Sequence, residues 1–222
     1  MTIAEKRKQK SIKKLKRRKI DYLETLPLIE TSVLVNLKSF DEICDRALAS
    51  FVAFQFACDI ANGQEYELVK DFYAQMLEDY DVKDCLLPSE QKIFDNNFNE
   101  QELIAVTWYY ETFWSLIWAL GLIKDKDMEK PYDMCDGKKA IELIIYCKDK
   151  NDFKQKCQLR DIEEILDMLD LYYRYHWACV DFSINQKTRI GKLNPDVVFE
   201  RRKGLEWLIS KEKDWEEISL DT

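Results

Sequence analysis

The sequence has few residues that interrupt helices, with only 5 glycines and 4 prolines among 222 residues. Sandwiches and barrels of short strands need a turn signal roughly every 8 to 12 residues, far more than this sequence supplies. It also lacks a phosphate-binding glycine loop, a Gly-x-Ser-x-Gly motif and a His-Glu-x-x-His motif. Because 46% of the residues are hydrophobic, the chain can bury a large core. These features predict an all-α, mainly helical fold.

The sequence contains one histidine and no Cys-x-x-Cys pair, which argues against a multi-histidine site or a zinc site of cysteine pairs. The seven cysteines are scattered and odd in number, so we expect small buried side chains and no disulfide framework. No apolar stretch follows the N-terminal charges, as a signal peptide would require. We therefore expect a protein of the reducing cytoplasm.

Charge is distributed unevenly along the chain. Residues 6–19 carry ten basic side chains and no acidic one, although the net charge of the whole chain is −8. The rest has 24 basic and 42 acidic residues, a net charge of −18. Such an acidic body repels a phosphate backbone, so nucleic acid is expected to bind, if anywhere, through residues 6–19. The alternative is a first helix whose basic face meets water or the acidic body.

Residues with N-cap chemistry precede several apolar runs at helical spacing. The expected caps are Ser39 with Glu42, Asn99 with Glu102, Asp136, and Asn194 before Pro195. A helix over 65–80 would place a set of apolar residues at helical spacing: Tyr66, Val69, Phe72, Tyr73, Met76 and Tyr80.

Two long helices, over 100–123 and 159–184, are expected at the centre of a compact single domain. That domain spans 21–222 and follows a basic N-terminal helix or arm over 1–20. The stretch from Ile184 to Leu193 is rich in turn residues and is the best candidate for a small hairpin. The stretch from Leu103 to Ile123 is long enough to cross a bilayer and has Glu111 as its only charge. A carboxylate at mid-membrane costs several kcal/mol, so we interpret this stretch as a core helix.

The second long helix carries an acidic stripe made of Glu163, Asp167, Asp170, Arg174 and Asp181. Three carboxylates on one helical face, here Glu163, Asp167 and Asp170, can hold magnesium when a neighbouring helix supplies further ligands. The Glu-Glu-x-x-Asp spacing at 163–167 loosely resembles the all-helical nucleotide pyrophosphohydrolases, but the next helix lacks their second acidic motif. The alternative is a solvated face on which Asp170 supports Arg174 at i,i+4.

Two isolated ionisable residues lie among apolar neighbours. Glu111 would need a cation such as Arg174, Arg201 or His176, or else a raised pKa and a proton. Such a pair is either structural or the mark of a pocket. His176 falls within the apolar arc of its helix, where we expect a core histidine bonded to a backbone carbonyl or carboxylate; a catalytic role is the alternative.

Several strings together resemble the bacterial domain-of-unknown-function family 4272, and Asp170 to Ala178 is the most specific of them. The strings are Arg7–Pro27, Trp108–Leu120, Pro131–Asp136, Leu159–Arg160, Glu164–Ala178, Asn194–Leu208 and Asp221–Thr222. The resemblance implies a bacterial, cytoplasmic, mostly helical domain without an assigned activity. It also implies one core or cleft around Glu111, Trp114, Asp170, Arg174, His176, Glu200 and Arg201.

The function we expect is that of a non-catalytic helical domain that binds a protein partner or a small ligand, without a cofactor. One alternative is a metal-assisted hydrolase of a phosphorylated small molecule that uses Glu163, Asp167 and Asp170. The other is a nucleic-acid-associated protein that acts through residues 6–19. The sequence leaves open whether the protein is an enzyme.

Overall fold

The computed structural model describes all residues from 1 to 222 and contains ten α-helices, two 3₁₀ helices and no strand, which confirms the all-α prediction. The α-helices are α1 Ile3–Arg18, α2 Phe40–Ala61, α3 Tyr66–Asp79, α4 Pro88–Phe94, α5 Glu100–Ala119, α6 Asp125–Met128, α7 Gly137–Ile145, α8 Lys150–Lys156, α9 Ile162–Ile184 and α10 Pro195–Ile209. The 3₁₀ helices are η1 Lys83–Cys85 and η2 Trp215–Glu217. No helix combines the length and the apolar character needed to cross a membrane.

The chain forms two compact units, and each is made of segments that are separate in the sequence. Unit 1 contains residues 1–38, 123–134 and 160–222, and unit 2 contains residues 39–122 and 135–159. The basic N-terminal helix is thus part of unit 1. A single helical domain over 21–222 stays a prediction.

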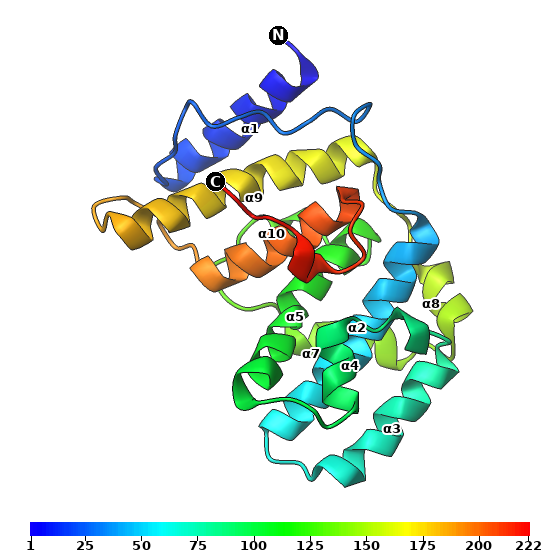
Figure 1. The fold of residues 1–222 in the computed structure, drawn as a ribbon. Coiled ribbons are helices and arrows are strands. Elements are labelled where there is room, and N and C mark those ends of the chain that lie inside the picture. Colours follow the sequence, from blue (N-terminus) through cyan, green and yellow to red (C-terminus); the bar gives the residue numbers. More distant parts are fainter. The chain divides into compact units, whose positions relative to one another are not determined.

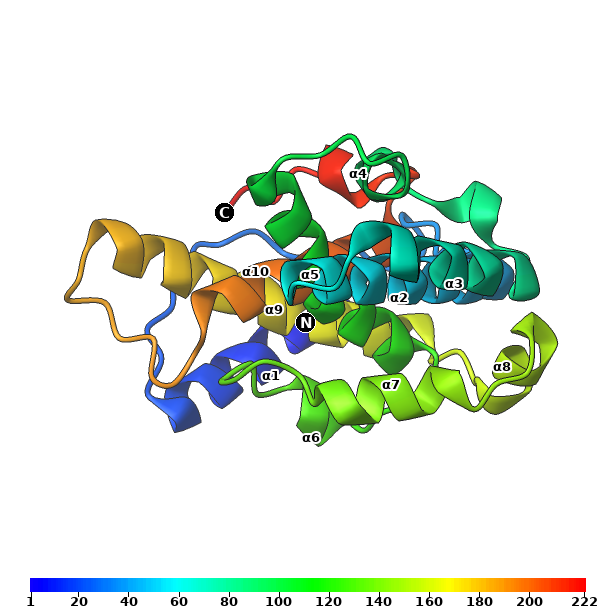
Figure 2. The ribbon, with the colours of Figure 1, turned by 90° about the horizontal axis from the view of Figure 1, so that it is seen from below.

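In unit 1, α9 lies between α1 and α10, as both views show (Figure 1, Figure 2). α1 buries Ile12 and Leu15, and α10 buries Val198 and Leu205. Tyr172 of α9 donates a hydrogen bond to the Met128 carbonyl at 2.7 Å, which ties the short helix α6 to α9. α9 is therefore covered on two sides, where the sequence predicted one apolar and one solvated side.

In unit 2, α2 is the central helix and pairs with α5 along most of its length. The rings of Phe54 on α2 and Phe113 on α5 meet at a centroid distance of 5.3 Å. α3, α4 and α8 also pack on α2, and α3 runs beside it in both views (Figure 1, Figure 2). The predicted core helix over 100–123 is present as α5, which ends at Ala119, and most of its side chains from Tyr109 onward are buried.

The expected N-caps are present. Ser39 and Asn99 form capping boxes with Glu42 and Glu102, Asp136 accepts a hydrogen bond from the Lys139 amide, and Asn194 caps α10. The caps work because a side-chain oxygen satisfies amides that have no partner within the first helical turn.

The hairpin expected between Ile184 and Leu193 is absent, because this segment is a series of turns. Its backbone pairs with the segment after α1. The Asp21 amide donates to the Arg189 carbonyl at 2.8 Å, and the Arg189 amide donates to the Asp21 carboxylate at 2.8 Å. Both backbone groups of Arg189 thus bond to Asp21, and the Thr188 and Leu193 amides close local turns with the Asn185 and Ile190 carbonyls.

Candidate functional site

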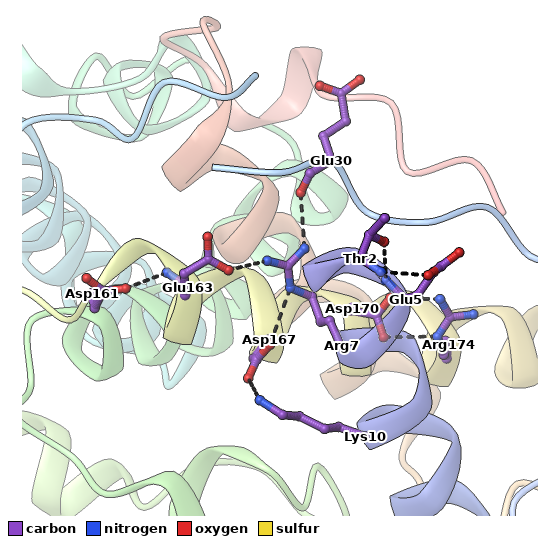
Figure 3. Close-up of polar contacts among 10 residues, drawn as sticks. All are labelled: Thr2, Glu5, Arg7, Lys10, Glu30, Asp161, Glu163, Asp167, Asp170 and Arg174. Carbon is purple, nitrogen blue, oxygen red and sulfur yellow. Dashed lines mark hydrogen bonds and ion pairs between the residues drawn. The ribbon is translucent and has the colours of Figure 1, made fainter. Parts of the chain in front are cut away.

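The acidic stripe of α9 meets the basic helix α1 (Figure 3). The Arg7 guanidinium is buried and bridges two carboxylates: Nη2 donates to Glu163 Oε2 at 2.6 Å and Nε to Asp167 Oδ1 at 3.3 Å. Its remaining nitrogen, Nη1, donates to the Glu30 carbonyl at 3.1 Å. Lys10 Nζ contacts Asp167 Oδ2 at 2.8 Å. The sequence left two alternatives for residues 6–19, a nucleic-acid-binding segment and a helix whose basic face meets water or acidic residues. The contacts of Arg7 and Lys10 agree with the second alternative.

Asp170 and Arg174 lie on the same side of α9 and have no exposed surface (0% each). Arg174 Nε donates to Asp170 Oδ2 at 3.0 Å and Nη2 donates to Oδ1 at 2.7 Å (Figure 3). Nη2 also contacts the Pro27 carbonyl at 3.3 Å. The i,i+4 pair is confirmed, but the prediction that it lies on a solvated face is wrong. Helical periodicity predicts which residues share a face of a helix, but it does not predict which other segment packs on that face.

The carboxylates proposed for magnesium are already engaged by cationic side chains. Arg7 lies between Glu163 and Asp167, and both oxygens of Asp170 accept hydrogen bonds from Arg174. A metal ion would have to displace a buried guanidinium from each position. No group of three or more His, Cys, Asp or Glu side chains is arranged to hold a metal ion.

His176 takes its hydrogen bond from Arg202, whose Nη1 lies 2.5 Å from His176 Nδ1. Burial, and then the nearby Arg202 charge, lower the pKa of His176 to about 4. Because a guanidinium is only a donor, Nδ1 must be the acceptor, and the neutral ring carries its proton on Nε2. The sequence predicted a backbone carbonyl or a carboxylate as the partner, which would require a proton on the bonded nitrogen.

Arg202 of α10 contacts several groups and was not among the predicted site residues. It contacts Glu206 Oε1 at 3.1 Å through Nη2 and at 3.2 Å through Nε. It also donates to the carbonyls of Leu220 and Asp221 at 3.0 and 3.1 Å, and so ties down the C-terminal segment. Its guanidinium lies over the Tyr173 ring, 4.8 Å from the centroid. The i,i+4 spacing of Arg202 and Glu206 is the one sequence signal that could have found it.

The other predicted site residues are buried in both units. In unit 1, Glu200 pairs with Lys203 at 3.2 Å, and Arg201 Nη1 approaches the Asp127 carbonyl at 3.5 Å. In unit 2, Glu111 Oε1 accepts a hydrogen bond from the Cys135 amide at 2.6 Å, and the Trp114 ring faces Lys139 Nζ at 5.9 Å. Unit 1 brings together the pair Asp170 and Arg174. That all seven residues surround one cleft stays a prediction.

Unit 2 presents a different kind of surface on α3. Tyr66 and Tyr73 anchor this helix: the Tyr66 hydroxyl donates to the Phe94 carbonyl at 2.7 Å, and the Tyr73 hydroxyl to Asp59 at 2.6 Å. The opposite side exposes Leu68 (74% exposed) and Phe72 (61%), one helical turn apart. Phe72, one of the apolar residues at helical spacing in this stretch, thus lies outside the core, and its ring meets the Tyr73 ring at a centroid distance of 5.1 Å.

Carboxylates surround this exposed apolar pair. Glu65, Glu67 and Asp71 have neither a hydrogen bond nor an ion pair through their side chains. Unit 2 as a whole has 10 basic and 20 acidic residues, a net charge of −10, whereas unit 1 has 24 basic and 22 acidic residues. We call Leu68, Phe72, Glu65, Glu67 and Asp71 the α3 surface.

The side of α1 that faces away from α9 also carries charged side chains without partners. Lys6, Lys13 and Arg17 are exposed at i, i+7 and i+11, and Lys19 follows at the end of the helix. None of these four side chains has an ion pair or a hydrogen bond. We call them the α1 row.

A family model, described as domain of unknown function DUF4272, matches residues 7–218 of the chain. Comparison with curated proteins and with solved structures gives no match.

Proposed function

The chain belongs to the DUF4272 family, a domain of unknown function, and we propose that it is a non-catalytic helical domain that binds a partner protein. The groups that suggested chemistry already have structural partners: Glu163 and Asp167 hold Arg7, Asp170 holds Arg174, and His176 is neutral and bonded to Arg202. Each would have to give up a buried contact before it could act on a substrate. We also propose a bacterial, cytoplasmic protein, in agreement with seven free cysteines.

The observation that carries this proposal is the exposure of Leu68 and Phe72 beside unpaired Glu67 and Asp71. Burial of one such apolar side chain is worth about 1.5 to 3 kcal/mol, so a partner that covers both gains substantially. The unpaired carboxylates select a partner with positive charge next to its apolar residues. The occupant we propose is therefore a basic, amphipathic helical segment of another protein, laid along α3.

A synthetic amphipathic helix of leucine and lysine is a direct probe of the α3 surface. We expect it to bind the full-length protein in isothermal calorimetry, and we expect Leu68→Ser or Phe72→Ser to weaken binding by about tenfold each. Ile145→Ser is the matched control, because Ile145 is an exposed apolar residue of unit 2 outside α3. The same peptide with glutamate in place of lysine should not bind.

Charge is tested separately from apolar contact. Glu67→Gln with Asp71→Asn should weaken lysine-peptide binding and flatten its salt dependence. Binding that survives Leu68→Ser, Phe72→Ser and the paired charge variant, or that Ile145→Ser reduces equally, would show that the peptide associates nonspecifically with acidic unit 2 and would refute the proposal.

A second candidate function rests on the α1 row. Lys6, Lys13 and Arg17 follow one helical face without partners, as a phosphate backbone requires of a basic helix. A labelled single-stranded oligonucleotide tests this function. Lys6→Gln, Lys13→Gln and Arg17→Gln combined should abolish salt-sensitive binding, whereas the matched triple Lys187→Gln, Lys192→Gln and Lys211→Gln elsewhere in unit 1 should leave it intact. Equal loss from both triples would reject α1 as the binding element.

A further inference from the structure

Two cysteines from distant parts of the sequence meet inside unit 2. Cys44 lies in the first half of α2, and Cys157 is the residue at which α8 ends. The two thiols are close enough for Cys157 to act on the pKa of Cys44, and α2 and α8 pack against each other. The Cys157 Sγ donates its hydrogen bond to the Phe153 carbonyl at 3.3 Å. Cys44 is fully buried, whereas Cys157 is partly exposed. One thiol of the pair is thus open to reagents and the other is shielded.

The surrounding contacts hold α8 in register with α2. Lys154 of α8 pairs with Asp41 at 2.7 Å and with Asp45 at 3.6 Å, and Lys150 contacts Asp45 at 3.5 Å. Phe153, on the same short helix, is fully buried. These contacts keep the end of α8, and with it Cys157, beside Cys44.

We infer that Cys44 and Cys157 form a reversible disulfide, a modification site that reacts with small-molecule disulfides such as oxidised glutathione. In the first step the Cys157 thiolate attacks one sulfur of oxidised glutathione. The glutathione S–S bond breaks, a mixed disulfide forms on Cys157, and one glutathione thiolate leaves and takes up a proton.

In the second step Cys44 attacks the Cys157 sulfur and displaces the second glutathione, which takes up the proton that Cys44 loses. The two protein thiols are oxidised by two electrons, and one glutathione disulfide is reduced to two thiols. Contact with Cys157 and burial raise the pKa of Cys44, so little of it is thiolate. The second step is therefore the slower one. It is intramolecular, because Cys44 and Cys157 lie close together in the same chain.

Cys147 is the competing partner. Burial raises the pKa of the Cys147 thiol, and the nearby Cys157 raises it further. Its Sγ is held elsewhere, donating to the Leu143 carbonyl at 3.4 Å and accepting from Lys156 Nζ at 3.1 Å. Since Cys157 Sγ also donates to a carbonyl, the difference lies in Lys156, which engages the Cys147 sulfur, and in the interaction of Cys157 with Cys44. We therefore assign the disulfide to Cys44 and Cys157.

The test is oxidation of the full-length reduced protein with oxidised glutathione, followed by thiol titration and nonreducing peptide mapping by mass spectrometry. We expect the wild type to fall from seven free thiols to five, with the Cys44 and Cys157 peptides linked and the link reversed by dithiothreitol. Cys44→Ser should stop at glutathione on Cys157, Cys157→Ser should form no link, and Cys147→Ser should behave as the wild type.

Mapping of the wild type decides the question even where a variant fails to fold. A link between Cys147 and Cys157, or stable glutathione on Cys157 of the wild type without an internal link, would overturn the inference. Failure of peptide binding at the α3 surface would leave it untouched, since the two sites share no residue.

Discussion

Buried charges in this protein are held in short, directed pairs. Arg174 gives Asp170 two hydrogen bonds, and in unit 2 Arg46 Nη2 contacts both oxygens of Glu90 at 2.7 and 2.6 Å. Desolvation of two such charges costs about as much as their attraction returns, so an intact buried pair contributes little to stability. Its loss matters, because a charge left alone in the interior has no compensation.

We therefore expect Asp170→Asn to lower the free energy of unfolding by about 3 kcal/mol or more, since Arg174 is left buried without a countercharge. The double variant Asp170→Leu with Arg174→Met should lose less, because it removes both charges and keeps apolar volume. Urea unfolding monitored by circular dichroism measures both. A double variant no more stable than the single one would show that the hydrogen bond to Pro27, and not charge balance, is the main contribution.

His176 predicts a dependence of stability on pH. Its folded pKa of about 4 lies below the ordinary value of 6.5, so between these values the unfolded chain binds more protons. The contribution of His176 to the free energy of unfolding is fully present above pH 6.5. It decreases as the pH falls toward 4, by up to about 3 kcal/mol. Glu206 acts in the opposite sense, because burial raises its pKa.

The comparison that isolates His176 is with His176→Gln, whose amide oxygen can still accept from Arg202. The wild type should lose more stability between pH 6.5 and 4 than this variant does, in urea unfolding at each pH. Parallel curves would mean that the histidine charges freely in the folded state.

At the scale of elements, the end of α5 shows how a single residue determines a boundary. The apolar run continues to Ile123, but the helix ends at Ala119. Gly121 has φ 76°, and a Cβ there would lie 2.7 Å from the Gln158 carbonyl oxygen. That close approach lets the Gln158 amide donate to the Leu120 carbonyl at 2.9 Å, which satisfies a group at the helix end.

Gly121→Ala should therefore be destabilising for two reasons, the left-handed backbone and the collision with Gln158. Gly63→Ala is the matched control, because Gly63 has φ 86° but no atom within 4 Å of its Cβ position. We expect about 1 kcal/mol of destabilisation for Gly63→Ala and clearly more for Gly121→Ala in urea unfolding. Equal losses would indicate that the backbone between α5 and α8 shifts to admit the methyl group.

At the scale of the whole molecule, the unequal charge of the two units follows from which segments each one gathers. Unit 1 takes the basic N-terminal helix and neutralises much of it against Glu163, Asp167 and Glu129. Unit 2 keeps an excess of ten acidic residues. We therefore expect any basic partner to be attracted to unit 2 and any anionic one to the α1 row, and high salt to weaken both interactions.

The disulfide inferred between Cys44 and Cys157 would join segments far apart in the sequence. Closing so long a loop restricts the unfolded chain, and oxidation should raise the free energy of unfolding by up to about 4 kcal/mol. Urea unfolding of the oxidised and reduced wild type measures this, with oxidant-treated Cys44→Ser as the control. Destabilisation on oxidation would show that the bond strains α2 or α8.

The sequence by itself determined the local structure of this protein. The capping boxes at Ser39 and Asn99, the core position of α5 and the pairing of Asp170 with Arg174 all follow from interactions among residues a few positions apart. The scarcity of glycine and proline likewise predicted the fold class. Such short-range effects act in the same way wherever the helix lies in the molecule.

Only the tertiary structure decided what each helix face meets. It placed α1 against the acidic stripe of α9, exposed Phe72 on α3, gave His176 an arginine as its partner and brought Cys44 near Cys157. Helical periodicity places residues on one face, but the covering element is chosen by packing between distant segments. For that reason only the structure shows that the candidate carboxylates contact Arg7 and Arg174, that Leu68 and Phe72 of the α3 surface are exposed and that α2 and α8 lie together.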